Sequence, residues 1–434
     1  MSSLRTALLL GALSVVALGS GTASAFCGTY AGSAGSTPTN RASQVVLVRE
    51  GRRTTITMAN DVVSAGTSLS MLIPVPGDVD PADVRLVDIG LMERVDKYAA
   101  PRLVEYTCDD LHGGDKAVGC AGCAGDLAKG LLSRFAYENL PGFLESAGLA
   151  DAAIEYEVLS PSSVEELSGA STLVGREIST AASPLIQEQI DAGSSFISVK
   201  IDLREAGLGA LWLPPIQFAY ESDNMVLPIK LGTTSSAGVQ DVILHVITGG
   251  TKGQVGISNY AEMSTDAECM WDREGLQSFS GFWNEKVDAA FVEAGGTAAF
   301  MTEYVWGPTA CDPCTGAGPL GEQDLKDLGY EGDPTQATLT RLHARFVASA
   351  VEADLMLYPT NSVTNQQYRF IAYDETLESD FPVCGEGFVD NPGSCEAEDT
   401  ALSGSAPLPV GWIVLAGGGL VGLARRRRGD PGRA

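Results

Sequence analysis

The chain has 434 residues, of which 44% are hydrophobic, and its formal net charge is −27 at neutral pH. That share of hydrophobic residues is typical of a globular protein and excludes a disordered chain. So large a negative charge repels phosphate backbones, and the sequence contains no P-loop. We therefore expect neither nucleic acid nor a nucleotide as a partner.

The first 25 residues have the layout of a secretory signal peptide. Arg5 is their only charge, residues 7–18 form an apolar stretch, and three small residues occupy positions 23–25. We expect signal peptidase and the export machinery as partners, with cleavage between Ala25 and Phe26. The alternative is an uncleaved anchor or a buried core helix, but the apolar stretch is shorter than the ~20 residues of a membrane span.

The body, residues 26–390, contains strand patterns in clusters, with helical patterns between the clusters. We predict strands over residues 45–48 and 54–58 (a hairpin that turns at 50–51), 69–75, 154–159, 196–201, 216–220, 226–231, 241–248 and 367–373. We predict helices over residues 91–98, 127–137 and 282–293 and through most of 165–190, with a loop over 109–125. This order predicts an α+β fold of antiparallel strands with interspersed helices, arranged as one body or as two lobes that divide near residues 140–195.

All nine cysteines lie in the part of the chain that we expect to be exported, where disulfides form. The disulfide candidates lie close in sequence, in loops: Cys120 and Cys123, Cys311 and Cys314, and Cys384 and Cys395. The Cys311 pair slightly resembles a thioredoxin-type redox pair, but its surroundings indicate a loop rather than a helix start. Because nine is odd, one thiol should be free, buried or bonded to another chain.

One cysteine cluster has an alternative as a metal site. Cys108, His112, Cys120 and Cys123 offer three thiolates and an imidazole, a set that holds zinc in closed tetrahedral sites. Their spacing matches no standard zinc finger, so we favour two disulfides and a bystander histidine.

Two further patterns bear on a metal or anion site. The acidic loop at residues 78–83 lacks the glycine of a calcium loop, so calcium has only weak support, and we expect no cofactor. His343 lies between Arg341 and Arg345; this group predicts either an anion site with a lowered histidine pKa or arginines paired with the chain's many carboxylates. His245 lies in an apolar strand and is interpreted as a core histidine.

The C-terminal end also has the sequence pattern of a segment that interacts with a membrane. Residues 391–407 form a small, polar linker, the 17 residues 408–424 carry no charge, and the tail 425–434 begins with four arginines. The apolar segment is marginal for a ~30 Å hydrocarbon core. It resembles the C-terminal sorting tails of bacterial envelope proteins, which a sorting protease recognises and cuts. The alternative is a single-pass transmembrane helix kept as a membrane anchor.

Several phrases of the body resemble one protein family in order along the chain. They occupy residues 26–28, 42–49, 57–61, 73–76, 98–106, 196–200, 213–216, 227–231 and 340–346. The chain is similar to the uncharacterised secreted bacterial family called domain-of-unknown-function family 2330, over roughly residues 26–373. The resemblance implies no activity and brings no catalytic residue.

The sequence also lacks the G-x-S-x-G elbow of serine hydrolases and the H-E-x-x-H motif of zinc proteases. We therefore expect an exported protein of the periplasm, envelope membrane or cell surface with a structural or binding role and no catalytic residues. The alternative is an exported hydrolase that uses paired carboxylates, with a structural metal at the Cys108 cluster.

Overall fold

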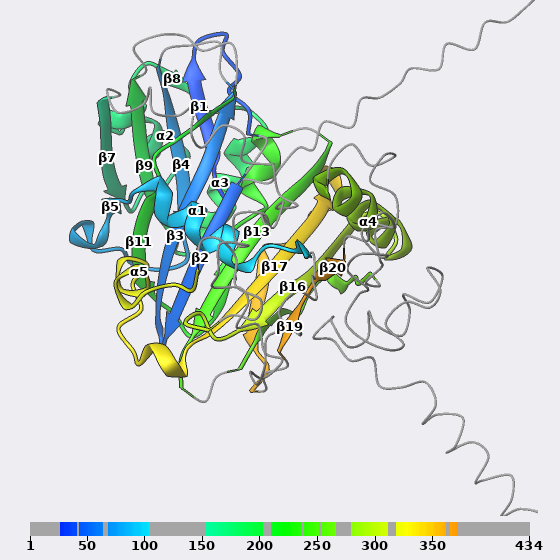
Figure 1. The fold of residues 1–434 in the computed structure, drawn as a ribbon. Helices are drawn as coiled ribbons and strands as arrows, with labels where there is room; N and C mark the ends of the chain where they lie inside the picture. The colour runs from blue at the N-terminus through cyan, green and yellow to red at the C-terminus, as the bar shows by residue number, and fades with distance from the viewer. Residues whose placement is uncertain are drawn as a thin grey trace, which may run out of the picture.

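The computed structural model in Figure 1 describes residues 27–40, 43–63, 68–104, 153–202, 210–236, 238–250, 253–265, 279–310, 318–361 and 365–371. Over these residues strands predominate, and most neighbouring strands are antiparallel.

The smaller of the two main sheets has five strands, and all its neighbours pair antiparallel. In spatial order they are β7 (Ala153–Leu159), β9 (Ser195–Asp202), β4 (Ser68–Val75), β1 (Thr29–Ser33) and β8 (Arg176–Glu177).

The larger main sheet has ten strands. Its main order is β15 (Ala261–Glu262), β16 (Ala298–Trp306), β17 (Thr338–Val347), β13 (Val239–Thr248), β2 (Ser43–Glu50), β3 (Arg53–Val63), β11 (Ile216–Glu221) and β5 (Arg85–Leu86). In addition, β10 (Ala210–Trp212) pairs with β3, and β19 (Gln366–Gln367) pairs with β16. The β13–β2 and β15–β16 pairs are parallel, and the other pairs are antiparallel.

Two small sheets and several helices complete the described fold. The small sheets are β12 (Met225–Leu227), β18 (Leu355–Pro359) and β14 (Val255–Ile257), and the parallel pair β20 (Arg369–Ile371) and β6 (Arg102–Val104). The α-helices are α1 (Ile89–Ala99), α2 (Val164–Ser168), α3 (Ala182–Asp191), α4 (Phe279–Glu293) and α5 (Glu322–Asp327). Short 3-10 helices are η1 (Pro81–Asp83), η6 (Ser171–Leu173), η7 (Leu231–Ser235), η8 (Pro334–Gln336) and η9 (Ala348–Ala350).

The two main sheets pack face to face around the largest hydrophobic core. Alternate side chains of β4, among them Leu69, Met71 and Ile73, meet Ile56 and Met58 from β3 in this core. Because successive strand residues point to opposite faces, Leu72 points outward instead, to a cluster with Ile186 of α3. The strand β4 is thus buried on both faces, which explains why it is apolar with little alternation.

Helices also cover the outer face of the larger sheet. Val46 of β2 lies in a cluster with Leu91 and Val95 of α1, whose first turn is capped by the Asp88 side chain accepting from the Gly90 N–H. Trp283 of α4 lies in a separate cluster with residues of β16. The sandwich therefore has four layers, with helices outside each sheet, as Figure 1 shows.

Most predicted elements are confirmed, including the hairpin β2–β3, the strands β4, β7, β9, β11 and β13, and the helices α1 and α4. Three predictions need correction. Residues 165–190 contain η6 and β8 between two short helices, the strand predicted over 226–231 ends at Leu227 before Pro228, and the one predicted over 367–373 is two short strands with different partners. The mixed, largely antiparallel character of the predicted α+β fold is confirmed.

The termini, the predicted helix over 127–137 and the predicted loop over 109–125 lie outside the described residues. Among the helices described, none is long and apolar enough to cross a bilayer. Cys27 is the one cysteine within the described ranges, and its thiol is free and buried.

Candidate functional site

The outer face of the larger sheet carries a set of buried charges under α1 and α4. On β17, Arg341, His343 and Arg345 alternate with Leu342 and Ala344. The two apolar residues belong to the core between the sheets, so the three cationic side chains share the opposite face. All three side chains are at most 3% exposed, so each needs an opposite charge beside it.

The central carboxylate lies at a β-bulge. Along β16, Thr302 pairs with Leu342 and Tyr304 with Arg341, which leaves Glu303 as an extra residue between them. Thr302 pairs with Leu342, whose side chain lies in the core, so regular alternation directs Glu303 to the opposite, charged face, where it accepts from Arg341. The bulge re-aims the next residue, Tyr304, to the same side as Glu303, into the cluster under α1.

His343 lies between two carboxylates. Its Nδ1 is 2.8 Å from Oε1 of Glu303, and its Nε2 is 2.8 Å from Oδ1 of Asp241, on β13. A neutral imidazole has only one N–H, whereas an imidazolium can donate to both carboxylates at once. The geometry is therefore that of a protonated histidine clamped between two acids.

The arginines extend this pattern in both directions. Arg341 donates from Nε to Glu303 and from Nη1 to Asp96 of α1, each at 2.5 Å. Arg345 donates two hydrogen bonds to the Asp241 carboxylate, from Nε to Oδ1 at 2.6 Å and from Nη2 to Oδ2 at 3.1 Å, so the pair is bidentate. Arg345 also donates to Asp288 of α4. Paired arginines, one of the two sequence-based alternatives, are thus confirmed.

We call the buried series Asp96, Arg341, Glu303, His343, Asp241 and Arg345 the ionic row. Acid and base alternate along it, and with His343 protonated its three carboxylates balance three cations. Asp288, whose side chain is 63% exposed, joins the row to the surface of α4. The ionic row therefore ties α1, three strands and α4 together.

The pKa directions follow from burial and from these partners. Burial alone lowers the pKa of His343, but the charges of Glu303 and Asp241 outweigh it and raise that pKa. Burial opposes ionisation of Asp241, yet Arg345 and His343 lower its pKa to about 2, and Arg341 and His343 likewise lower the pKa of Glu303. The other sequence-based alternative, a lowered pKa for His343, is wrong, because the arginine charges are neutralised by carboxylates that lie closer.

His245 shows the opposite behaviour on the same face. It is fully buried, and its Nε2 lies 3.1 Å from Nη1 of Arg341. Because an arginine can only donate, Nε2 accepts and the ring is neutral. Burial and the Arg341 charge both lower the pKa of His245. The prediction of a core histidine is confirmed.

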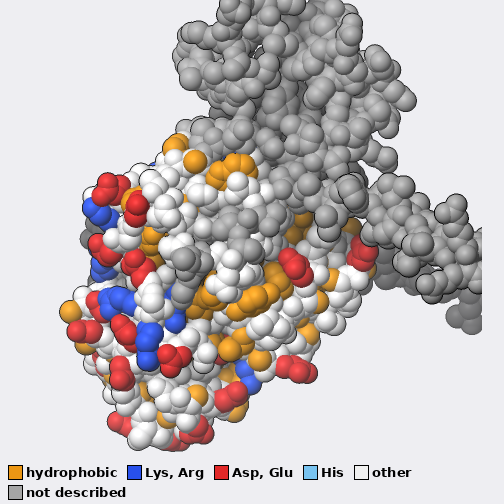
Figure 2. Space-filling view, turned by 90° about the horizontal axis from the view of Figure 1, so that it is seen from below, with side chains coloured by type: hydrophobic (Ala, Val, Ile, Leu, Met, Phe, Trp, Pro, Cys, Tyr) orange, Lys and Arg blue, Asp and Glu red, His pale blue; other side chains and the backbone are white. Residues whose placement is uncertain are grey.

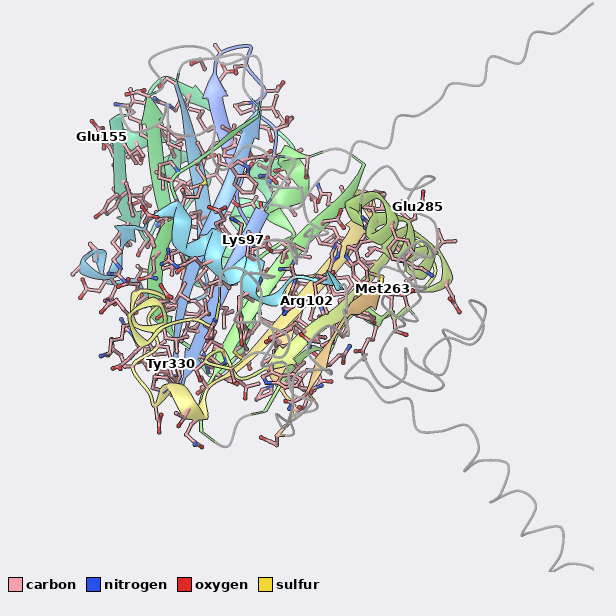
Figure 3. The ribbon with its side chains drawn as sticks, viewed as in Figure 1. Lys97, Arg102, Glu155, Met263, Glu285 and Tyr330 are labelled. Carbon is pink, nitrogen blue, oxygen red and sulfur yellow. The ribbon has the colours of Figure 1, made fainter. Side chains whose placement is uncertain are left out.

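A second aromatic and cationic group lies beside the row, at the end of α1. The Arg102 guanidinium stacks 5.9 Å from the centre of the Tyr304 ring and donates from Nη2 to the Tyr98 carbonyl at 2.6 Å. Tyr98 packs edge-on against Tyr304, and its hydroxyl donates to the Gly307 carbonyl at 2.6 Å. Figure 3 shows Arg102 just beyond α1, which carries Lys97.

The arrangement can neutralise charge and fix geometry, but it leaves no reactive atom at a surface. Glu303 and His343 are 0% exposed, and Asp241 is 2% exposed. A general acid or base must come within hydrogen-bond distance of a substrate, which these groups cannot do in this conformation. In this conformation the buried groups neutralise one another's charge and hold the elements that carry them.

The sequence-predicted metal and disulfide residues lie outside the described residues: Cys108, His112, Cys120, Cys123, Cys311, Cys314, Cys384 and Cys395. Within the ranges that the structure covers, no group of three or more histidine, cysteine or acidic side chains is arranged to hold a metal ion. In the acidic loop, Asp80 caps η1 by accepting from the Ala82 N–H, and Asp83 pairs with Arg53 at 3.0 Å.

Sequence reasoning missed the acidic half of the ionic row. The carboxylates Asp96, Asp241 and Glu303 lie between 38 and 245 residues away from their β17 partners. The alternation of Arg341, His343 and Arg345 with apolar residues was the available signal, since in a strand it places all three on one face.

Comparisons with known proteins identify one family. A family model described as an uncharacterized protein conserved in bacteria (DUF2330) matches residues 21–358, which confirms the resemblance seen in the sequence. No curated protein matches the chain. Among solved structures, the crystal structure of baculovirus P35 matches with 11% identity over 53% of this chain and 76% of that chain, at a TM-score of 0.24.

Proposed function

We propose that this chain, which belongs to the family of uncharacterized proteins conserved in bacteria (DUF2330), is an exported envelope or cell-surface protein. Its body acts as a rigid scaffold with a structural or binding role rather than as an enzyme. The ionic row supports the scaffold role, because each of its charged groups is paired with another charged group inside the fold.

The ends of the sequence support export. An N-terminal segment with one arginine, an apolar stretch and three small residues is handled by the secretion machinery. At the other end, an uncharged segment followed by four arginines is retained at or sorted through a membrane. We propose that the part after the linker serves as a sorting signal or anchor.

The packing of the body supports a scaffold role. Two sheets share one core, helices cover both outer faces, and the ionic row links α1 to α4 through β16, β17 and β13. Buried ion pairs contribute little net stability compared with apolar residues, but they can specify one arrangement of neighbouring elements. We infer that the row fixes how the helices sit on the sheet.

The alternative, a carboxylate-dependent hydrolase, has one observation in its favour: Glu303 and Asp241 meet at the same histidine. A hydrolase of this kind needs one carboxyl group whose pKa is raised so that it can act as an acid. Here the pKa of both carboxyl groups is lowered, and neither is accessible. The scaffold role therefore has more support.

Expression of the full gene in a bacterium, followed by cell fractionation and mass measurement of the purified protein, tests this proposal. We expect the protein in the envelope or medium, with Phe26 as its first residue. Recovery of the uncut chain from the cytosol would contradict export. Hydrolysis of polysaccharide or peptide substrates that His343→Gln abolishes while the fold persists would contradict the scaffold role.

A further inference from the structure

The four outer edges of the two main sheets are not equivalent. In the described part of the chain, the larger sheet ends in β15 and β5, and the smaller sheet ends on one side in β8, each only two residues long. Short edge strands offer few unpaired backbone groups to another chain. The fourth edge is β7, which is seven residues long.

Among the described residues, the outer edge of β7 has no partner strand. Ala153–Leu159 pairs in register with β9 on one side, and no described strand pairs with its other side. In an antiparallel pair, every second residue directs its N–H and C=O away from the partner strand. Figure 1 shows β7 at the left margin of the sandwich, and Figure 3 shows Glu155 there.

The two faces of β7 differ in chemistry. Ile154 and Val158 pack against the core between the sheets, and Tyr156, on the same face, is 41% exposed and donates its hydroxyl to the Val84 carbonyl at 2.9 Å. Glu155 and Glu157 lie on the opposite face. The Glu155 side chain is 66% exposed and lies 3.3 Å from Lys200 on β9, whereas the Glu157 carboxylate accepts hydrogen bonds from the Ser171 hydroxyl and, at 3.3 Å, from the Thr172 N–H of η6.

A second copy of this chain is a poor occupant of the edge. Antiparallel pairing of two β7 strands centred on Tyr156 places Glu155 opposite Glu157 of the other copy, twice. Like charges directly opposite on neighbouring strands destabilise the pair. The net charge of −27 adds to this repulsion.

We propose that β7 is a docking edge for an extended basic segment of another protein, which adds as a sixth strand to the smaller sheet. Main-chain hydrogen bonds supply affinity, and lysine or arginine at alternate positions lies on the acidic face of β7, with the exposed carboxylate of Glu155 as its main partner. Apolar residues between the cations extend the row of Ile154 and Val158. This inference rests on the proposed binding role, to which it adds a class of partner, but it does not depend on export. The localisation experiment can therefore fail while the peptide-binding experiment succeeds.

A synthetic seven-residue peptide with lysine and valine alternating, capped at both ends, is the probe. Two N-methylated versions are the matched controls, one methylated on the lysine amides and one on the valine amides. Because amides alternate between the two edges of a strand, one version keeps the edge that pairs with β7 and the other loses it. We expect one version to bind like the parent and the other to bind at least about tenfold more weakly, as measured by fluorescence anisotropy.

Charge variants test the acidic face. The variant Glu155→Lys should bind the lysine peptide about fivefold more weakly than the wild type does. It should bind more tightly a peptide in which glutamate replaces each lysine. Glu293→Lys, at an exposed position at the end of α4, makes the same change in net charge and should leave both affinities unchanged.

Three results would overturn the proposal. They are no binding of the parent peptide, equal binding or equal loss for the two methylated versions, and equal effects of the two charge variants. Either of the last two results would mean that the peptide is attracted by the net charge of the protein and does not pair with β7. Figure 2 shows acidic and basic side chains intermingled on the face that it presents, so this control matters.

Discussion

Replacement of Glu303 by glutamine removes the central carboxylate of the ionic row without changing its size. Glu303 accepts from Arg341 at 2.5 Å and from His343 at 2.8 Å, and both partners are fully buried. A hydrogen bond to a charged group contributes about 1.5–3 kcal/mol, so loss of both costs about 3–6 kcal/mol. The amide oxygen still accepts one bond and Arg341 keeps Asp96, so we expect the free energy of unfolding to fall by about 3 kcal/mol.

Urea denaturation at pH 7, followed by tryptophan fluorescence, measures this loss. Glu322→Gln is the control, because that side chain forms an exposed pair with Lys326 within α5 and should leave the midpoint unchanged. The double variant Glu303→Gln with His343→Gln should lose less than the sum of the single variants, since the bond that they share is lost only once. A Glu303→Gln variant as stable as the wild type would refute this reasoning.

Four further predictions concern buried groups that do not reach solvent. Because the pKa of His343 is raised in the folded state, protonated His343 stabilises the fold below about pH 6.5, and this contribution is lost as the pH rises through the pKa of the folded state. The variant His343→Gln should therefore have a free energy of unfolding that depends less on pH on the alkaline side. The pKa of His245 is lowered, so stability falls as the pH drops below about 6.5, and His245→Gln should flatten that acidic slope instead; interchanged effects would contradict both assignments. The Cys27 thiol, whose pKa burial raises, should react with iodoacetamide only when urea unfolds the chain, and rapid labelling of the native protein would contradict its burial. Neither amide atom of Gln240 has a hydrogen-bond partner within the described structure, so Gln240→Met should raise the free energy of unfolding by about 1–3 kcal/mol in the same urea assay, whereas a loss would show that the amide is satisfied.

The elements that the sequence predicted are those whose local pattern is strong. The β2–β3 hairpin follows from an apolar run, a Glu-Gly turn with Gly51 at a φ of 61°, and a β-branched run, all within 15 residues. The α1 helix follows from the spacing of Leu91, Val95 and Tyr98.

The missed features depend on tertiary structure. β17 has charged residues at every second position, a pattern that usually marks a strand with one face in solvent; here α1 and α4 cover that face. The position of Tyr304 on the same side as Glu303 depends on a bulge that strand alternation does not encode. Asp96 lies on the buried side of its helix only because Arg341, 245 residues away, neutralises it.

Nitrogen NMR of the histidine rings, with the signal of His343 assigned by its loss in His343→Gln, tests the ionic row most directly. At neutral pH in the folded protein, we predict protons on both ring nitrogens of His343, because the neighbouring carboxylates raise its pKa above that of a free histidine. A neutral ring with one protonated nitrogen at that pH would contradict the closed, internally balanced row and with it the scaffold role built on it.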